Sequence, residues 1–241
     1  MKINCYSVTF WFNIFDNHNF LLEVLQNELK DEYDKYNFFK YTNNLVAPII
    51  SAINNEKMTN LSFSQINLQY NMDKVSLKNI DDFKTKVQKL FDILSQNEIQ
   101  VLHTAIYVNG EIIDDNALNN IIKYTINPSL NSDSLVDINL KLGKCYEELF
   151  YKNITLLNKK QIKLPKITDK QGRNVPIPLI SWNGAYIENE LIDFSYEIND
   201  KYLFDFTKDY HTTEFYLNKM LYLLSENLED DINNLINKGE F

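Results

Sequence analysis

The stretch KNIDDFKTKVQKLFDILSQNEIQVLHTAIYVNGEII, residues 78–113, decides the fold. Its first part repeats apolar side chains at the spacing of one helix face, which predicts an amphipathic helix. This apolar stripe consists of Phe83, Val87, Leu90, Phe91 and Leu94. The second part, residues 99–113, predicts a strand. We expect a hairpin turn within it at Asn109-Gly110, because this dipeptide favours tight turns.

The residues before this stretch predict the same kind of unit. Residues 5–15 alternate and are rich in aromatic side chains, which predicts a strand. Residues 19–36 carry leucines at helical spacing and predict a helix. Two extended segments follow, at 38–54 and 61–71. The order strand, helix, two extended segments, helix and strand is that of a ferredoxin-like unit, so we expect an N-terminal α+β domain over 1–128.

The second half begins after a polar loop at 126–134 and predicts another α+β domain over 135–241. A long helix, at about 210–237, ends this half, and Gly239 is a suitable stop. The predicted strands are 135–142, 149–157, 191–198 and 201–206, the last two forming a hairpin across Asn199-Asp200. We therefore predict an α+β fold with two ferredoxin-like halves, a mostly antiparallel sheet and a long C-terminal helix.

The charges are unevenly distributed. The formal net charge is −9. Residues 1–184 carry 20 acidic and 20 basic side chains, whereas residues 185–241 carry 13 acidic and four basic ones. A nucleic-acid binder typically has a basic domain and several arginines, but Arg173 is the single arginine against 23 lysines. This composition disfavours nucleic acid as a partner without excluding it. With five glycines in the whole chain, the sequence also disfavours a glycine-rich phosphate-binding loop.

The sequence predicts a cytoplasmic protein. Cys5 and Cys145 lie far apart and match no zinc or redox spacing, which favours reduced thiols. The N-terminus has the alternation of a strand and lacks the pattern of a signal peptide. No apolar run approaches the ~18 residues that a membrane span requires, so we expect no membrane association.

The basic stretch KKQIKLPKITDKQGRNVPIP, residues 159–178, is the candidate contact site. Its basic residues are Lys159, Lys160, Lys163, Lys166, Lys170 and Arg173. One interpretation is an edge strand and loop whose lysines and prolines discourage edge-to-edge pairing. The other is a projecting basic arm that meets an acidic partner, a nucleic acid or the acidic C-terminal quarter of another copy. Trp182 follows directly and is either a core residue or an interface anchor.

The histidines and carboxylates indicate no catalytic site. His103-Thr104-Ala105 and His211-Thr212-Thr213 resemble the His-x-Ser/Thr pairs of two-histidine phosphoesterases, but His103 lacks the hydroxyl at the third position. We interpret His103 as a half-buried strand residue and His211 as a residue at a helix start. Asp209 has the position of a helix N-cap. No ligand spacing points to a metal, and we predict no cofactor.

The layout of the chain also resembles a known family. Its pieces are INLQYNMDKVSL, DDFKTKVQKLFDIL, the strand at 101–108, LVDINLKL and EINDKYLFDFTKDYHTTEFYLNKMLYLL. In this order they resemble a sporadically distributed bacterial family of no established function, often encoded in mobile-element or defence loci. The resemblance implies an antiviral-defence setting and supplies no catalytic residues.

We therefore expect a non-enzymatic cytoplasmic interaction protein, part of an anti-phage defence or mobile-element system. A protein partner is expected, and assembly of the chain with itself stays open. The alternative is an RNA-binding or RNA-processing protein built from tandem ferredoxin-like domains, which requires a basic groove. The candidate partner-binding residues are those of the basic stretch together with Trp182.

Overall fold

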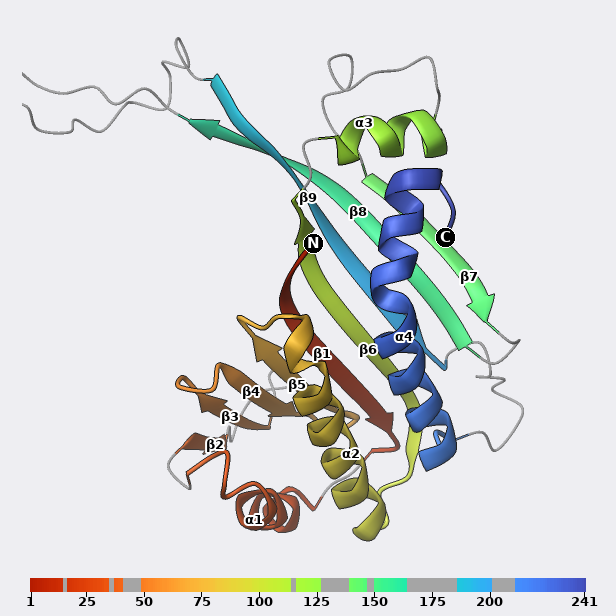
Figure 1. Cartoon of the computed structure of the whole chain (residues 1–241). Coiled ribbons are helices and arrows are strands. Elements are labelled where there is room, and N and C mark those ends of the chain that lie inside the picture. The colour runs from red at the N-terminus through yellow and green to blue at the C-terminus, as the bar shows by residue number, and fades with distance from the viewer. Residues whose placement is uncertain are drawn as a thin grey trace, which may run out of the picture.

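One sheet of nine strands forms the centre of the molecule (Figure 1). The computed structural model describes residues 1–14, 17–34, 37–40, 49–113, 116–126, 139–146, 150–163, 186–200 and 211–241. The strands follow the order β2-β3-β4-β5-β1-β6-β9-β8-β7, and neighbouring strands pair antiparallel throughout. Their bounds are β1 Lys2–Phe12, β2 Phe38–Lys40, β3 Ile50–Asn54, β4 Thr59–Phe63, β5 Asn67–Asp73, β6 Val101–Ile112, β7 Asn139–Tyr146, β8 Phe150–Lys163 and β9 Tyr186–Asn199.

The helices of the described chain all lie outside this sheet. Their bounds are α1 His18–Glu28, α2 Ile80–Gln96, α3 Ala117–Ile121 and α4 Glu214–Lys238, with a 3₁₀ turn at Leu77–Asn79 and a π-helical turn at Ile122–Ile126. None of the helices in the described part combines the length and apolar character that a bilayer span requires. The predicted α+β class, antiparallel sheet and C-terminal helix are thus confirmed.

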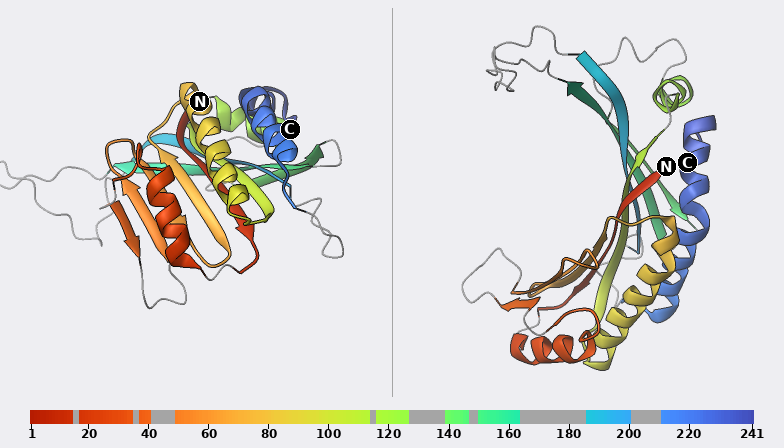
Figure 2. Two further views of the ribbon diagram at one scale, coloured as in Figure 1. Left: turned by 90° about the horizontal axis from the view of Figure 1, so that it is seen from below. Right: turned by 60° about the vertical axis from the view of Figure 1, so that its left-hand side comes forward.

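The sheet is curved, and the helices cover its convex side (Figure 2). On β1 the side chains alternate, so Tyr6, Val8 and Phe10 are fully buried in the core that the helices cover. The opposite face carries Ser7 and Thr9 from the same strand. The core thus lies between the convex face of the sheet and the helices.

In the N-terminal half, the order of the strands in the sheet differs from their order in the chain. Strand β1 lies between β6 and β5, and β5 in turn pairs with β4. Helix α1 separates β1 from β4 in the chain, and α2 joins β5 to β6. Strands β2 and β3 extend this arrangement at the edge. Because β6 also pairs with β9, the same sheet continues into the second half of the chain.

The single strand predicted at 61–71 is wrong: this segment contains the end of β4, a turn and most of β5. Ser64 forms the turn, since its hydroxyl accepts hydrogen bonds from the backbone N–H of Ile66 at 3.3 Å and of Asn67 at 3.1 Å. A serine that bonds the backbone two or three residues on is a turn signal. Alternation continues through this turn and hides it.

The hairpin turn predicted at Asn109-Gly110 is also wrong, because β6 runs without interruption from Val101 to Ile112. Strand β6 pairs with β1 on one side and β9 on the other, so both of its edges are occupied. Gly110 is required for close packing: a Cβ there would lie 2.6 Å from the ring of Phe194 and would also meet the carbonyl of Lys2. Glycine is needed at this position because the neighbouring backbone and ring approach too closely to leave room for a side chain.

The C-terminal helix begins later than the sequence predicts. Thr213 is its N-cap, and its hydroxyl accepts a hydrogen bond from the backbone N–H of Tyr216 at 3.3 Å. Asp209, the predicted cap, lies outside the described residues. The predicted stop is confirmed, since Gly239 adopts the left-handed conformation with φ of 71°.

Candidate functional site

The basic stretch begins on a two-stranded ribbon that extends beyond the body of the sheet (Figure 1). Strand β7 pairs with β8 only as far as Leu157, and β6 pairs with β9 only as far as Ile192. Residues 159–163 of β8 and 186–191 of β9 therefore pair only with each other among the described residues. We name these two segments the β8–β9 ribbon. At about 3.3 Å per residue it is roughly 17 Å long.

The ribbon carries three of the predicted contact residues, Lys159, Lys160 and Lys163. In the register of the two strands, Lys160 stands opposite Glu190. The other predicted contact residues, Lys166, Lys170, Arg173 and Trp182, lie outside the described residues. The ribbon is compatible with both interpretations of the basic stretch. It projects from the sheet, as expected for a basic arm, and its outer edges are unpaired within the described chain, as expected for an edge strand.

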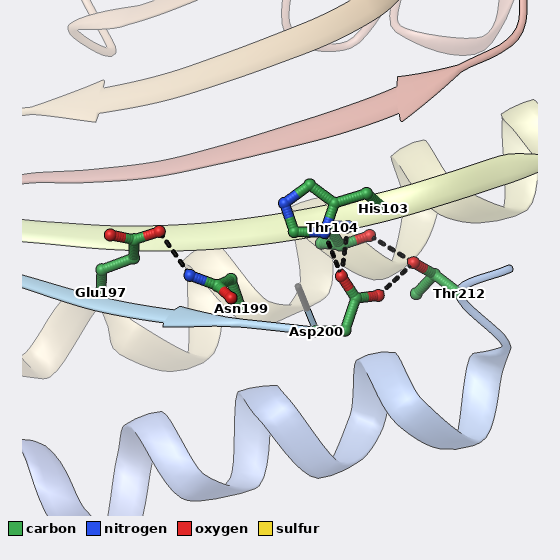
Figure 3. A network of polar contacts seen from close by, with 6 residues as sticks. All are labelled: His103, Thr104, Glu197, Asn199, Asp200 and Thr212. Carbon is green, nitrogen blue, oxygen red and sulfur yellow. Dashed lines mark hydrogen bonds and ion pairs between the residues drawn. The ribbon is translucent and has the colours of Figure 1, made fainter. Parts of the chain in front are cut away.

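A polar network surrounds His103 at the end of β9 (Figure 3). The carboxylate of Asp200 is buried and contacts Nδ1 of His103. It also accepts a hydrogen bond from the backbone N–H of Thr104 at 2.9 Å and one from the hydroxyl of Thr212. The hydroxyl of Thr104 donates in turn to that of Thr212 at 3.1 Å. One face of the His103 ring stacks on Trp11, with ring centres 4.7 Å apart.

This network joins three segments that are distant in sequence. Thr104 belongs to β6, Asp200 follows β9, and Thr212 precedes α4. A histidine bonded to a buried carboxylate can also act as a general base in catalysis. Such a pair activates a nucleophile, which a substrate has to reach. The hydroxyls of the network belong to Thr104 and Thr212, which are 0% and 2% exposed. Both hydroxyls are engaged in hydrogen bonds within the network, and we interpret the network as a latch that holds the start of α4 against the sheet.

A second buried charge lies at the end of α1. Glu32 is buried, and its carboxylate accepts a hydrogen bond from the hydroxyl of Tyr70 at 3.0 Å and pairs with the ammonium group of Lys86. Burial, followed by the charge of Glu32, raises the pKa of the Tyr70 hydroxyl, which keeps it a hydrogen-bond donor. Glu32, Thr59 and Lys86 line a cavity of about 480 Å³. These contacts tie the turn that follows α1 to α2 and β5.

A third buried charge joins the sheet to the C-terminal helix. The ammonium group of Lys152 on β8 donates to Asp231 of α4 at 2.6 Å, and the hydroxyl of Tyr196 on β9 donates to the same oxygen at 2.7 Å. Burial lowers the pKa of Lys152, and the hydrogen bond and charge of Asp231 act in the opposite direction. A buried lysine requires such a partner, because an unpaired charge in the core is costly.

The sequence did not reveal these carboxylates. Asp200 appears in the sequence only as a turn residue after a strand, and Glu32 and Asp231 appear as ordinary charged residues of predicted helices. His103 is a partly buried residue of β6, as the sequence predicted, and His211 lies just before α4 and is exposed. Within the described residues, no group of three or more histidine, cysteine and acidic side chains is placed to hold a metal ion.

In comparisons with known proteins, no protein-family model matches the chain, and no curated protein matches it.

Proposed function

We propose that this protein is a non-enzymatic interaction protein of the bacterial cytoplasm, which contacts a protein partner through the β8–β9 ribbon. The observation that carries the proposal is the extension of the ribbon past both neighbouring strands. A projecting ribbon whose two outer edges are unpaired among the described residues offers backbone groups for pairing with another chain. Its lysines add attraction for an acidic surface, which speeds and orients encounter.

We also propose that the first half is a ferredoxin-like unit. Its support is the strand order β6-β1-β5-β4 together with the positions of α1 and α2 in the chain. For the second half, the described elements are β7, β8, β9, α3 and α4, and a ferredoxin-like arrangement there stays a prediction. A place in an anti-phage defence or mobile-element system rests on the layout resemblance alone.

The proposal is tested by reversing the charge of the ribbon. The variant Lys159→Glu, Lys160→Glu, Lys163→Glu should lose a partner that the wild-type protein captures from its native host, while its melting temperature stays the same. The captured protein is then identified by mass spectrometry and purified, and we expect the variant to bind it at least about tenfold more weakly. The matched control changes Lys78, Lys123 and Lys238 to glutamate, three exposed lysines away from the ribbon. Equal binding by both variants would remove the ribbon as the contact.

The RNA-binding alternative is decided by the same variants. A gel shift with short single-stranded RNAs that appears at low salt, weakens as salt increases and disappears in the ribbon variant would favour RNA as the partner. The absence of any shift at low salt would exclude this alternative.

A further inference from the structure

The outer face of α4 carries an unusual exposed stripe. Phe215 and Tyr222 are 69% and 55% exposed, although both are large aromatic side chains. They are seven residues apart, and Glu226 and Glu229 follow at steps of four and three, so all four share one face of the helix. Asp230 is exposed beside them. We name Phe215, Tyr222, Glu226, Glu229 and Asp230 the α4 stripe.

The composition of the α4 stripe is that of a binding surface for a basic segment. Exposed aromatic residues supply buried area and anchors at protein interfaces. Three carboxylates next to them attract basic side chains, and Lys219, whose ammonium group lies 5.9 Å from the centre of the Tyr222 ring, is the one basic residue of α4 near the aromatic pair. The stripe lies opposite the buried face of α4 and therefore contributes nothing to the core.

The chain itself supplies a segment of matching charge and length. The β8–β9 ribbon carries three lysines, Lys159, Lys160 and Lys163, against two glutamates, Glu188 and Glu190, so its net charge is +1 and that of the remainder of the chain is −10. From Phe215 to Glu229 the stripe is roughly 20 Å long, at about 1.5 Å per residue, which is close to the length of the β8–β9 ribbon. The ribbon points away from α4 of its own chain (Figure 1), so the two surfaces can meet only between molecules.

We propose that the α4 stripe binds the β8–β9 ribbon of a second copy of this chain. This inference rests on the proposed function, in which the ribbon is the contact, and names the partner surface. Each chain carries both surfaces, so a two-fold dimer makes the contact twice. The contact is charged and exposed, and its strength therefore decreases with salt.

Sedimentation equilibrium tests the assembly first. At about 0.1 M salt, where charges are screened over about 10 Å, we expect a monomer–dimer equilibrium; at about 1 M salt, where the screening length is about 3 Å, we expect monomer. The variant Phe215→Ser, Tyr222→Ser should weaken dimerisation at least about tenfold at low salt, because it removes the apolar anchors. A wild-type protein that stays monomeric at low salt overturns the inference.

A charge exchange identifies the two surfaces. The ribbon variant Lys159→Glu, Lys160→Glu, Lys163→Glu and the stripe variant Glu226→Lys, Glu229→Lys, Asp230→Lys should each be monomeric. Combining all six changes in one chain should restore the dimer, because the two reversed surfaces attract each other again. Circular dichroism confirms that each variant is folded. The control with Lys78, Lys123 and Lys238 changed to glutamate should still dimerise.

The outcomes separate this inference from the proposed function. If the ribbon variant loses its native partner while the wild-type chain is monomeric, the ribbon is a contact and the α4 stripe is not its partner surface. If both single-surface variants are monomeric but the six-fold variant does not dimerise, the two surfaces do not bind each other. If the dimer behaves as expected and no other native protein is captured, the proposed contact with a different protein fails.

Discussion

At the scale of single residues, the molecule depends on charges buried in pairs. Glu32 with Lys86 and Lys152 with Asp231 each connect a helix to another element. Removing one partner of a buried pair leaves an uncompensated charge, which costs more than the pair itself contributes. Neither pair is visible in the sequence, because lysine, glutamate and aspartate side chains are usually solvated.

The variant Lys86→Met should destabilise the protein because it leaves the carboxylate of Glu32 buried without a cation. Breaking a fully buried pair costs about 3–5 kcal/mol, and we expect about 2 kcal/mol here because solvent screens a partly exposed lysine. The side chain of Lys86 is 29% exposed. The matched control is Lys84→Met on the same helix, which removes a surface pair with Asp81 and should cost less than about 0.5 kcal/mol. Urea unfolding measures both; equal losses would show that the Glu32 pair is not special.

The two cysteines should differ in reactivity. Burial, the hydrogen bond of the thiol to the Asp73 carboxylate and the charge of that carboxylate raise the pKa of the Cys5 thiol from 9.0 to about 12, whereas Cys145 is exposed. At about pH 9 iodoacetamide should modify Cys145 and spare Cys5, because the thiolate is the reacting form. Mass spectrometry identifies the modified cysteine, and both should react in guanidinium chloride.

The same pKa shift has a consequence for stability. Between pH 9.0 and about 12 the unfolded chain releases the Cys5 proton first. Folded protein then binds more protons than unfolded protein, so the contribution of Cys5 to stability is lost as the pH increases through this window. A Cys5→Ala variant should show a smaller decrease in stability over the same range. Equal slopes, or equal alkylation of the two cysteines in the folded state, would contradict the raised pKa of the Cys5 thiol.

At the scale of elements, the amphipathic periodicity of the sequence predicted the helices well, whereas local turn signals predicted the turns poorly. The stripe of α2 was correct, because a 3.6-residue period has no other simple cause in a chain of this composition. The turn between β4 and β5 was missed because alternation continues through it. The turn at Asn109-Gly110 was predicted wrongly because tertiary pairing on both edges of β6 overrides a local turn preference.

The variant Gly110→Ala tests the central position of β6. A Cβ at this position would lie 2.6 Å from the ring of Phe194 and against the backbone of β1, neither of which can move freely within the sheet. We expect a loss of about 2–3 kcal/mol, the upper part of the range of about 1–3 kcal/mol for overpacking a closed core. Asn109→Ala, at the neighbouring exposed position, should change stability by less than about 0.5 kcal/mol. Similar unfolding midpoints for the two variants would contradict the close packing.

At the scale of the whole molecule, the sheet joins the two halves of the chain. The domains predicted over 1–128 and 135–241 stay predictions, but β6 of the first and β9 of the second are paired over eight residue positions. The latch at Asp200 and the contacts of α4 with α2 and α3 add further connections. Elements so connected are expected to unfold together.

Calorimetry should therefore show one cooperative transition, with equal calorimetric and van't Hoff enthalpies. The variant Asp200→Ala, which removes the latch, should lower the melting temperature of this single transition without dividing it. Two separate transitions in the wild-type protein would indicate that the halves are independent domains. A cooperative monomer also provides the reference for the dimerisation experiments, since dimerisation makes the transition depend on protein concentration.

The sequence by itself determined the class of the fold, the principal helices and the position of the basic stretch. These features follow from local periodicity and composition, which act within a few residues. Only the tertiary structure decided that both halves share one sheet, that β8 and β9 extend beyond it as a ribbon, and that Asp200, Glu32 and Asp231 are buried. Strand order, strand overhang and charge burial depend on residues far apart in the chain, and such pairings leave no local pattern.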